Sequence, residues 1–204
     1  MASEIKGIIF DYGNVLCEPQ EPHEVQAMAD ALELELEPFK EKYWRDRRTY
    51  DRADLGAAEY WNRIAGRELS LGELGTAIEL DNKGWLHRRE RTLAWVGQAS
   101  RMGLRTGLLS NLPVSLRDAL EQVDWLPQFD VRTYSCTLGR IKPEPEIYAD
   151  CVGGLGLKPD EVVFLDDRPE NVRGADEVGL HGLLFESADQ AASELAGRYR
   201  VSLL

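Results

Sequence analysis

From three observations, the sequence predicts an α/β protein with a Rossmann-like, doubly wound parallel sheet and a small inserted helical cap. Short apolar runs alternate with helical patterns along most of the chain, which is typical of a parallel sheet. Polar residues with catalytic potential directly follow several of these runs, at the edge where open α/β sheets bind ligands. One long stretch, residues 18–89, shows helical spacing alone.

The first expected strand, residues 5–10, is a short Ile-rich apolar run that stops at a tight polar loop, residues 11–14. This pattern is typical of a buried parallel strand. Further strands are expected at 104–109, 131–135, 162–165 and 182–185. Turn residues follow each run and a helical pattern follows most of them, so the strands should lie parallel in one sheet.

The stretch of residues 18–89 contains no convincing strand. Its apolar residues recur at helical spacing, as in Val25, Met28, Ala29 and Leu32. Because it follows the first strand directly, it should lie over the carboxyl ends of the strands and act as a lid. We therefore expect a core domain of residues 1–17 and 90–204 and a helical cap domain of residues 18–89. The insertion's tryptophans are expected to form its own small core: Trp44, Trp61 and Trp85.

The composition is that of a globular protein with an acidic excess. Nucleic-acid binding needs clustered Lys and Arg, so the net charge of −12 argues against a nucleic-acid partner. The same charge repels small anions, so a bound anion would need a local cation, either a metal or a placed Lys. No apolar run reaches the length of a membrane span, and the chain reaches its first strand without room for a signal peptide. Widely spaced cysteines without a CxxC pair fit a reducing compartment, so we expect a cytoplasmic protein whose oligomeric state the sequence does not indicate.

Four short motifs occur in order at the ends of the expected strands or in adjoining loops: Asp11, Ser110-Asn111, Lys142 and Asp166-Asp167. Taken singly, each also occurs as a solvated turn, a helix cap or a surface residue. Their joint occurrence in this order favours a functional role, because the ends of parallel strands meet in one crevice of a doubly wound sheet.

This crevice would suit phosphate chemistry with Mg²⁺, which prefers carboxylate oxygens such as those of Asp11 and Asp166. The cation would shield an incoming phosphate, so that a free oxygen of Asp11 can attack phosphorus. Lys142 adds a point charge close to both nucleophile and phosphate, so we expect Asp11 and Lys142 to be catalytic. Lys142, the Ser110 hydroxyl and the Asn111 amide are expected to bind the phosphate of the substrate.

The segments that carry these motifs resemble the haloacid dehalogenase superfamily, and the similarity spans nearly the whole chain. The segments are Asp11-Tyr12-Gly13-Asn14-Val15-Leu16, Leu109-Ser110-Asn111, Lys142-Pro143 and Phe164-Leu165-Asp166-Asp167. The resemblance implies a Rossmann-like core with a helical C1-type cap inserted after the first motif. Residues 140–148 and 166–175 resemble the branch that contains sugar-1-phosphate phosphatases and the phosphatase half of soluble epoxide hydrolases.

The resemblance also implies roles for individual residues. Asp11 would be the nucleophile, and a metal site for Mg²⁺ would comprise Asp11, the Gly13 carbonyl, Asp166 and, through a metal-bound water, Asp167. By the same carry-over, Asn171 would steady the loop of the last motif. Gly13 departs from the family pattern, because most phosphatases of the superfamily carry there an Asp that acts as general acid and base. Such a group is worth about 10²- to 10⁴-fold, so another group or water must move the proton, or the enzyme must prefer leaving oxygens that need little protonation.

Other side chains are weaker candidates. His23 is the only His near the first motif and could supply the missing proton from the cap side. Arg45, Arg47 and Arg48 form a basic cluster that would either touch the substrate or make a solvated helix face. Cys17 is expected to be a small buried residue rather than part of the entrance.

The sequence therefore predicts a Mg²⁺-dependent phosphatase that hydrolyses a small phosphorylated metabolite, which could be a sugar phosphate, through an aspartyl-phosphate on Asp11. Two alternatives stay open. A metal-independent 2-haloacid dehalogenase would use Asp11 to attack carbon, although such enzymes of this superfamily tend to lose the acids equivalent to Asp166 and Asp167. A non-catalytic phosphate-binding protein would keep the pocket, although it would not need the nucleophile.

Overall fold

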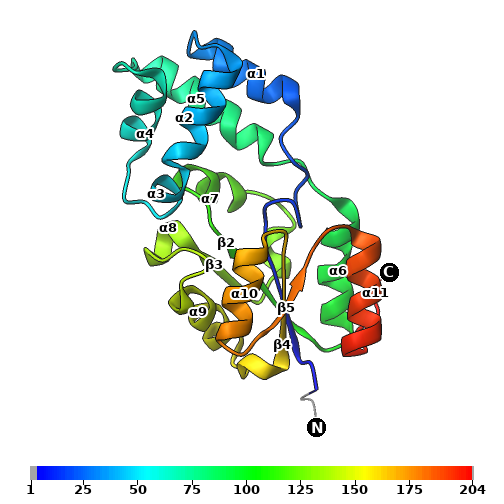
Figure 1. The fold of residues 1–204 in the computed structure, drawn as a ribbon. Helices are drawn as coiled ribbons and strands as arrows, with labels where there is room; N and C mark the ends of the chain where they lie inside the picture. The colour runs from blue at the N-terminus through cyan, green and yellow to red at the C-terminus, as the bar shows by residue number, and fades with distance from the viewer. Residues whose placement is uncertain (1–3, 204) are drawn as a thin grey trace.

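Within residues 4–203, which the computed structural model describes, the protein forms a five-stranded parallel sheet with helices on both faces and a helical cap above it (Figure 1). The strands are β1 (Gly7–Phe10), β2 (Arg105–Ser110), β3 (Val131–Tyr134), β4 (Val162–Asp166) and β5 (His181–Leu184). Their order, β3-β2-β1-β4-β5, places the first strand in the centre. This is the order of a doubly wound sheet, so the predicted fold class is confirmed.

All five predicted strands are present, with ends shifted by two residues at most. The central strands β1 and β4 are buried along their whole length. Along β1, Ile8 and Phe10 join the apolar cluster on one face of the sheet, and Ile9 joins the cluster on the other. A parallel strand covered on both faces needs apolar residues at every position, which explains why these strands appear in the sequence as continuous apolar runs.

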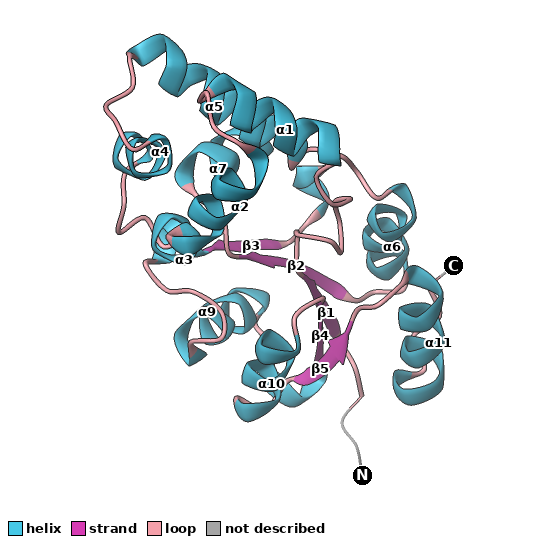
Figure 2. Cartoon of the chain, turned by 45° about the horizontal axis from the view of Figure 1, so that its top comes forward, coloured by secondary structure: helices cyan, strands magenta, loops and turns pink. Residues whose placement is uncertain are grey.

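Two pairs of helices cover the sheet (Figure 2). One face carries α6 (Glu90–Arg101) and α11 (Ala188–Tyr199), and the other carries α9 (Pro145–Leu155) and α10 (Pro169–Glu177). Shorter connecting elements are α7 (Val114–Leu120), α8 (Ser135–Leu138) and the 3₁₀ turns η1 (Leu126–Gln128) and η2 (Pro159–Glu161). Among the described residues no helix combines the length and apolar character needed to cross a membrane.

The cap segment lies above the carboxyl ends of the strands. It consists of α1 (Pro22–Ala31), α2 (Leu36–Arg45), α3 (Arg47–Asp51), α4 (Ala57–Ala65) and α5 (Leu71–Gly84). Trp61 is fully buried in a separate apolar cluster of these helices, as expected. The expectation is wrong for Trp44, which is half exposed, and for Trp85, which packs against the cluster of the core, because both side chains lie on the side of the cap that faces the core. The division of the chain into two domains stays a prediction.

The two crossings of the chain between core and cap lie side by side. An isolated antiparallel β-bridge joins Cys17, on the way out, to Arg88, on the way back. The Arg89 amide also donates to the Leu16 carbonyl at 2.9 Å. The cap is therefore connected to the core through one two-stranded junction.

Candidate active site

Asp11 is the first residue after β1, and both its backbone and its side chain are held in place. Its amide donates to the Leu165 carbonyl at 2.9 Å, which continues the pairing of β1 with β4. The chain then turns sharply, and the Tyr12 amide donates to Asp11 Oδ1 at 2.7 Å. The Leu16 amide closes the turn by donating to the Tyr12 carbonyl at 2.9 Å. The Asp11 carboxylate is therefore fixed at the end of the central strand.

Lys142 joins the motifs, because its ammonium group lies between two carboxylates. Nζ is 2.7 Å from Asp11 Oδ1 and 2.6 Å from Asp166 Oδ2, and it donates to the Leu109 carbonyl at 3.2 Å. The side chain is 1% exposed, and a buried charge is tolerated only with such partners. Burial lowers the pKa of Lys142, but the two adjacent carboxylates outweigh burial and hold the pKa above its ordinary value. The residue stays a cation, which meets the need for a local positive charge.

Asp166 ends β4 and is completely buried. The Arg168 amide donates to Asp166 Oδ1 at 2.8 Å, and Asn171 Nδ2 lies 3.0 Å from both carboxylate oxygens. The Tyr148 hydroxyl in turn donates to the Asn171 carbonyl at 2.8 Å. Asn171 therefore lies where it can brace the loop after β4.

Asp167 completes a group of three carboxylates. Asn14 Nδ2 donates to Asp167 Oδ2 at 2.8 Å, which joins the first motif to the last. One oxygen from each of Asp11, Asp166 and Asp167 lies within 4.8 Å of the others. Burial raises the pKa of Asp11 to about 7, against the opposing charge of Lys142. Three carboxylates beside one ammonium leave an excess of negative charge that a divalent cation would balance, and their hard oxygen atoms suit Mg²⁺.

Ser110 and Asn111 stand at the end of β2, and both line the cavity above the carboxylates. The Asn111 side chain pairs with the backbone of Lys142 in both directions. Its Nδ2 donates to the Lys142 carbonyl at 3.2 Å, and the Lys142 amide donates to its Oδ1 at 2.8 Å. Sequence reasoning missed this bracing role, since nothing in the spacing of the two motifs indicates that their loops pair.

Gly13 also lines the cavity, beside Asp11. Its backbone is not in the left-handed region. A Cβ atom added there would have one neighbour within 4 Å outside its own chain segment, Trp85 Cζ3 at 3.9 Å. The position where the family resemblance leads to the expectation of an acid therefore has room for a side chain here.

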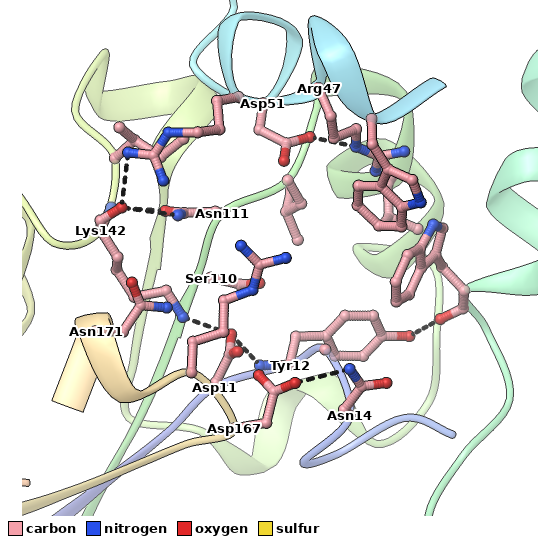
Figure 3. A pocket seen from close by; sticks show the side chains of 18 residues that line it. Asp11, Tyr12, Asn14, Arg47, Asp51, Ser110, Asn111, Lys142, Asp167 and Asn171 are labelled. Atoms are coloured by element: carbon pink, nitrogen blue, oxygen red, sulfur yellow. Dashed lines mark hydrogen bonds and ion pairs between the residues drawn. The ribbon is translucent and has the colours of Figure 1, made fainter. Parts of the chain in front are cut away.

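A cavity of about 380 Å³ opens above these residues, between the core and the cap (Figure 3). Its floor comes from the ends of the strands. Its cap side is lined by residues on the inner face of the helices: Trp44, Arg47, Arg48, Asp51 and Trp85. Arg168, from the loop after β4, also lines it. Cavities of this size hold small organic ligands.

The three arginines of the basic cluster in the cap lie in three different environments. Arg48 lines the cavity as an exposed residue. Arg47 also lines it, but its guanidinium is buried, with Nε 2.8 Å from Asp51 Oδ1 and Nη1 3.2 Å from Asp81 Oδ2. Arg45 is not among the lining residues and pairs loosely with a neighbouring acid at the surface. Sequence reasoning missed Asp51, although its position four residues after Arg47 allows this ion pair along one helix face.

Two weaker candidates lie away from the cavity lining. The His23 side chain is 75% exposed, and its Nδ1 is 3.2 Å from Glu21 Oε2. Cys17 is fully buried, and burial raises the pKa of its thiol to about 12. Cys17 is therefore the small buried residue that was expected.

A family model described as a haloacid dehalogenase-like hydrolase matches residues 5–179. The chain belongs to this family. The resemblance drawn from the motifs is thus confirmed, and the protein is a hydrolase of the haloacid dehalogenase superfamily.

Several curated relatives share parts of this hydrolase. Flavin mononucleotide hydrolase 1 of Arabidopsis thaliana is 50% identical over 62 residues, 30% of this chain and 25% of that protein. Bifunctional epoxide hydrolase 2 of Mus musculus is 41% identical over 81 residues, 39% of this chain and 15% of that protein. Phosphatase MT3486 of Mycobacterium tuberculosis is 27% identical over 195 residues, with 91% of this chain and 89% of that protein covered. The first two matches span a quarter or less of the relatives' own lengths.

The fold of the hydrolase is shared with solved structures. One is a haloacid dehalogenase family enzyme, bt-2542 of Bacteroides thetaiotaomicron, in complex with magnesium and inorganic phosphate. The similarity has a TM-score of 0.74 at 20% identity and covers 91% of this chain and 98% of that one. At this identity, the likeness supports the fold alone.

Proposed function

We propose that this hydrolase is a Mg²⁺-dependent phosphatase that acts on a small phosphorylated metabolite through an aspartyl-phosphate on Asp11. The observation that carries the proposal is the buried ion cluster of Asp11, Lys142 and Asp166, with Asp167 beside it, at the floor of the cavity. A phosphate dianion approaching these carboxylates needs a bound cation, because like charges repel strongly at short range. The phosphatase among the full-length relatives supports the same reaction class.

The metal would be held by Asp11, the Gly13 carbonyl, Asp166 and Asp167, and when bound it would shield the charge of the phosphate. Asp11 is ready to act as the nucleophile because the Tyr12 amide and Lys142 both bind its Oδ1. These two contacts hold the carboxylate in one orientation, so little rotational freedom is lost when the phosphate arrives.

Two further side chains stabilise the phosphate. Lys142 neutralises charge that builds up between Asp11 and the transferred group, and the Ser110 hydroxyl donates to one phosphate oxygen. Transfer to Asp11 releases the alcohol, and water then cleaves the acyl phosphate to restore the carboxylate. Asn111 contributes by holding the backbone of Lys142 in register.

The walls of the cavity favour a compact anionic metabolite. Arg48 and Arg168 line it as cations, and Trp44 and Trp85 add aromatic surface on the cap side. A sugar phosphate fits this description. Flavin mononucleotide also belongs in a test panel because of the plant relative's name.

The experiment is a panel of phosphate esters assayed with Mg²⁺ and again with excess EDTA. The panel contains 4-nitrophenyl phosphate, glucose 1-phosphate, glycerol phosphate and flavin mononucleotide. Release of inorganic phosphate that depends on Mg²⁺ supports the proposal, and undiminished turnover in EDTA contradicts it. Chloride release from 2-chloropropionate would identify a dehalogenase, and phosphate binding without turnover would identify a binding protein.

A further inference from the structure

The proposed phosphatase reaction requires proton transfers for which no residue has yet been identified. A departing alkoxide must gain a proton, and the water of the second step must lose one. Gly13 has no side chain for this purpose, and the exposed His23 is not among the residues that line the cavity. The cavity does contain another carboxyl group, that of Asp51.

Asp51 is the last residue of α3, and its side chain is 11% exposed. Its Oδ1 accepts a hydrogen bond from Arg47 Nε at 2.8 Å. No residue of the described part of the chain donates a hydrogen bond to Oδ2. Figure 3 shows the carboxyl group directed into the cavity, on the opposite side from Asp11 and Asp167. One oxygen therefore orients the group, and the other is open to a ligand.

Asp51 is fixed to the core as well as to the cap. The Ser135 hydroxyl donates to the Asp51 carbonyl at 2.5 Å, and the same hydroxyl oxygen accepts the Leu112 amide at 2.9 Å. Leu112 follows directly on the Ser110-Asn111 motif. The hydroxyl of Tyr50, the residue directly before Asp51, lies 3.0 Å from the Ser115 hydroxyl. These bonds hold the end of α3 in register with the phosphate-binding loop after β2.

The surroundings of Asp51 suit a group that gives and takes protons near neutral pH. Burial raises the pKa of Asp51 to about 6, while the charge and hydrogen bond of Arg47 oppose the rise. The titratable and charged groups that face it from each neighbouring element are Arg47 of α3, Tyr60 of α4, Asp81 of α5, Cys136 of α8 and Arg168 of the loop after β4. General acids and bases work best when their pKa lies close to the working pH.

Other groups along the cavity are less suited. The Tyr12 hydroxyl donates to the Trp85 carbonyl, and burial raises its pKa, so it does not exchange a proton readily. Arginine side chains do not act as proton donors or acceptors in proteins under ordinary conditions. Asp167 belongs to the proposed metal site. Asp51 is the remaining carboxyl among the described lining residues.

We propose that Asp51 is the acid-base residue of the phosphatase reaction, taking over from the cap side the task that Gly13 leaves open. This inference rests on the proposed function. In the first step an Asp11 oxygen bonds to phosphorus, the bond from phosphorus to the ester oxygen breaks, and the carboxyl proton of Asp51 passes to that oxygen. In the second step the Asp51 carboxylate accepts a proton from water, the resulting hydroxide bonds to phosphorus, and Asp11 is released as a carboxylate.

The decisive experiment compares leaving groups in the wild type and in Asp51→Asn. Asn keeps the shape and the oxygen that accepts from Arg47, but it has no proton to give. The variant should lose about 10²-fold or more in kcat on glycerol phosphate. It should lose only a few-fold on 4-nitrophenyl phosphate, whose leaving oxygen needs little protonation. A plot of log kcat/KM against leaving-group pKa should therefore be steeper for the variant than for the wild type.

The matched control is Asp54→Asn, in the same segment of the cap. The Asp54 side chain is 58% exposed and does not line the cavity, so this variant should keep the wild-type slope. Equal slopes for wild type and Asp51→Asn would overturn the inference. A uniform loss on all esters would also overturn it, because that result indicates a role in substrate binding or folding.

A second variant tests proton transfer directly. Gly13 has room for a side chain, so the double variant Gly13→Asp, Asp51→Asn should regain at least tenfold on glycerol phosphate over Asp51→Asn. If Asp51 only bound the substrate, an Asp at position 13 on the opposite side of the cavity could not replace it. A double variant with no more activity on glycerol phosphate than Asp51→Asn would therefore count against proton transfer by Asp51.

The wild type provides a test that does not depend on whether the variants fold. Its slope against leaving-group pKa should be shallow below about pH 6 and steeper above, because Asp51 loses its proton over that range. A slope that stays constant from pH 5 to 8 would contradict the inference. If the wild type turned over none of the esters with Mg²⁺, the proposed function itself would fail, which is a separate result.

Discussion

Two buried ion clusters border the cavity, one from the core and one from the cap, and they share a charge pattern. In the core, Lys142 lies between Asp11 and Asp166. In the cap, Arg47 lies between two carboxylates in the same way, those of Asp51 and Asp81. Each cluster places one buried cation between two acids, an arrangement that is costly to desolvate unless its hydrogen bonds are satisfied.

The clusters differ in what completes them. The core cluster has a third carboxylate beside it, Asp167, so its negative charge exceeds what Lys142 can balance. The cap cluster is completed by a phenol instead, because the Tyr43 hydroxyl donates to Asp81 Oδ1 at 2.6 Å and contacts Arg47. The proposed Mg²⁺ would balance the excess charge of the core cluster, whereas the cap cluster leaves a single carboxyl group, Asp51, that can hold a proton.

The largest effect is expected from removing the proposed nucleophile, Asp11. Asp11→Asn keeps the shape of the side chain but loses the attacking oxygen, so kcat with Mg²⁺ should fall on the order of 10⁴-fold or more while the fold is kept. Steady-state kinetics on 4-nitrophenyl phosphate, with circular dichroism as the control for folding, measures this. Retention of more than about a hundredth of the activity would rule out nucleophilic catalysis by Asp11.

The second effect compares the two cations. Lys142→Met and Arg47→Met each leave buried carboxylates without their cationic partner, so each should lower the free energy of unfolding by about 3–5 kcal/mol. Mg²⁺ should restore part of that loss in Lys142→Met, since the metal takes up the exposed charge, and none in Arg47→Met. Urea unfolding with and without Mg²⁺ tests the difference. An equal response to Mg²⁺ would show that the two clusters are not chemically distinct.

The third effect is the pH dependence of metal binding. In the metal-free protein burial raises the pKa of Asp11 to about 7, so below that pH a proton competes with Mg²⁺ for the carboxylate. The affinity for Mg²⁺ should therefore fall about tenfold for each pH unit below 7. Because the pKa is raised on folding, the contribution of Asp11 to stability without metal is present below about pH 4 and is lost as the pH rises towards 7. Calorimetric titration at several pH values measures the affinity, and a constant value from pH 5 to 8 would contradict this account.

The smallest effect concerns the bond that joins the two regions. Ser135→Ala removes the hydroxyl that bridges the Asp51 carbonyl and the Leu112 amide. The free energy of unfolding should fall by about 1 kcal/mol, with a further loss of kcat on alcohol phosphates as α3 loses its register. The same change at Ser70, which caps α5 away from the cavity, should affect stability to a similar degree and leave kcat unchanged.

The floor of the site could be predicted because its signals are local. Asp11, Ser110 and Asp166 each stand at the end of an apolar run, so the strand pattern alone places them at one edge of the sheet. Lys142 could be included in the predicted site because it precedes a helix in the loop between two such runs. Lys142 contacts both Asp11 and Asp166, and Ser110 lines the cavity above them, which agrees with the expected position, while their catalytic roles remain for experiment.

The cap side of the site could not be predicted in the same way. Asp51 is the last residue of a helix of five residues. Its backbone carbonyl is held opposite the ends of the strands by a hydrogen bond from Ser135, 84 residues along the chain. Helical periodicity identifies which residues are apolar, but it does not show which face of a short helix meets the core. For the same reason the sequence assigned Trp44 and Trp85 to the interior of the cap, whereas both line the cavity.

The paired crossings at Cys17 and Arg88 have a mechanical consequence. Because both crossings lie side by side in one two-stranded junction, the cap can rotate about that junction without stretching the chain. Contacts between cap and core resist such a rotation. They include the bond from the Ser135 hydroxyl to the Asp51 carbonyl, the Tyr50–Ser115 hydroxyl pair and the bond from Asn82 Nδ2 to the Ser115 carbonyl. Breaking these contacts would move the Asp51 carboxyl away from Asp11. In the proposed mechanism, closure of the cap and placement of the proton donor would therefore occur in one movement.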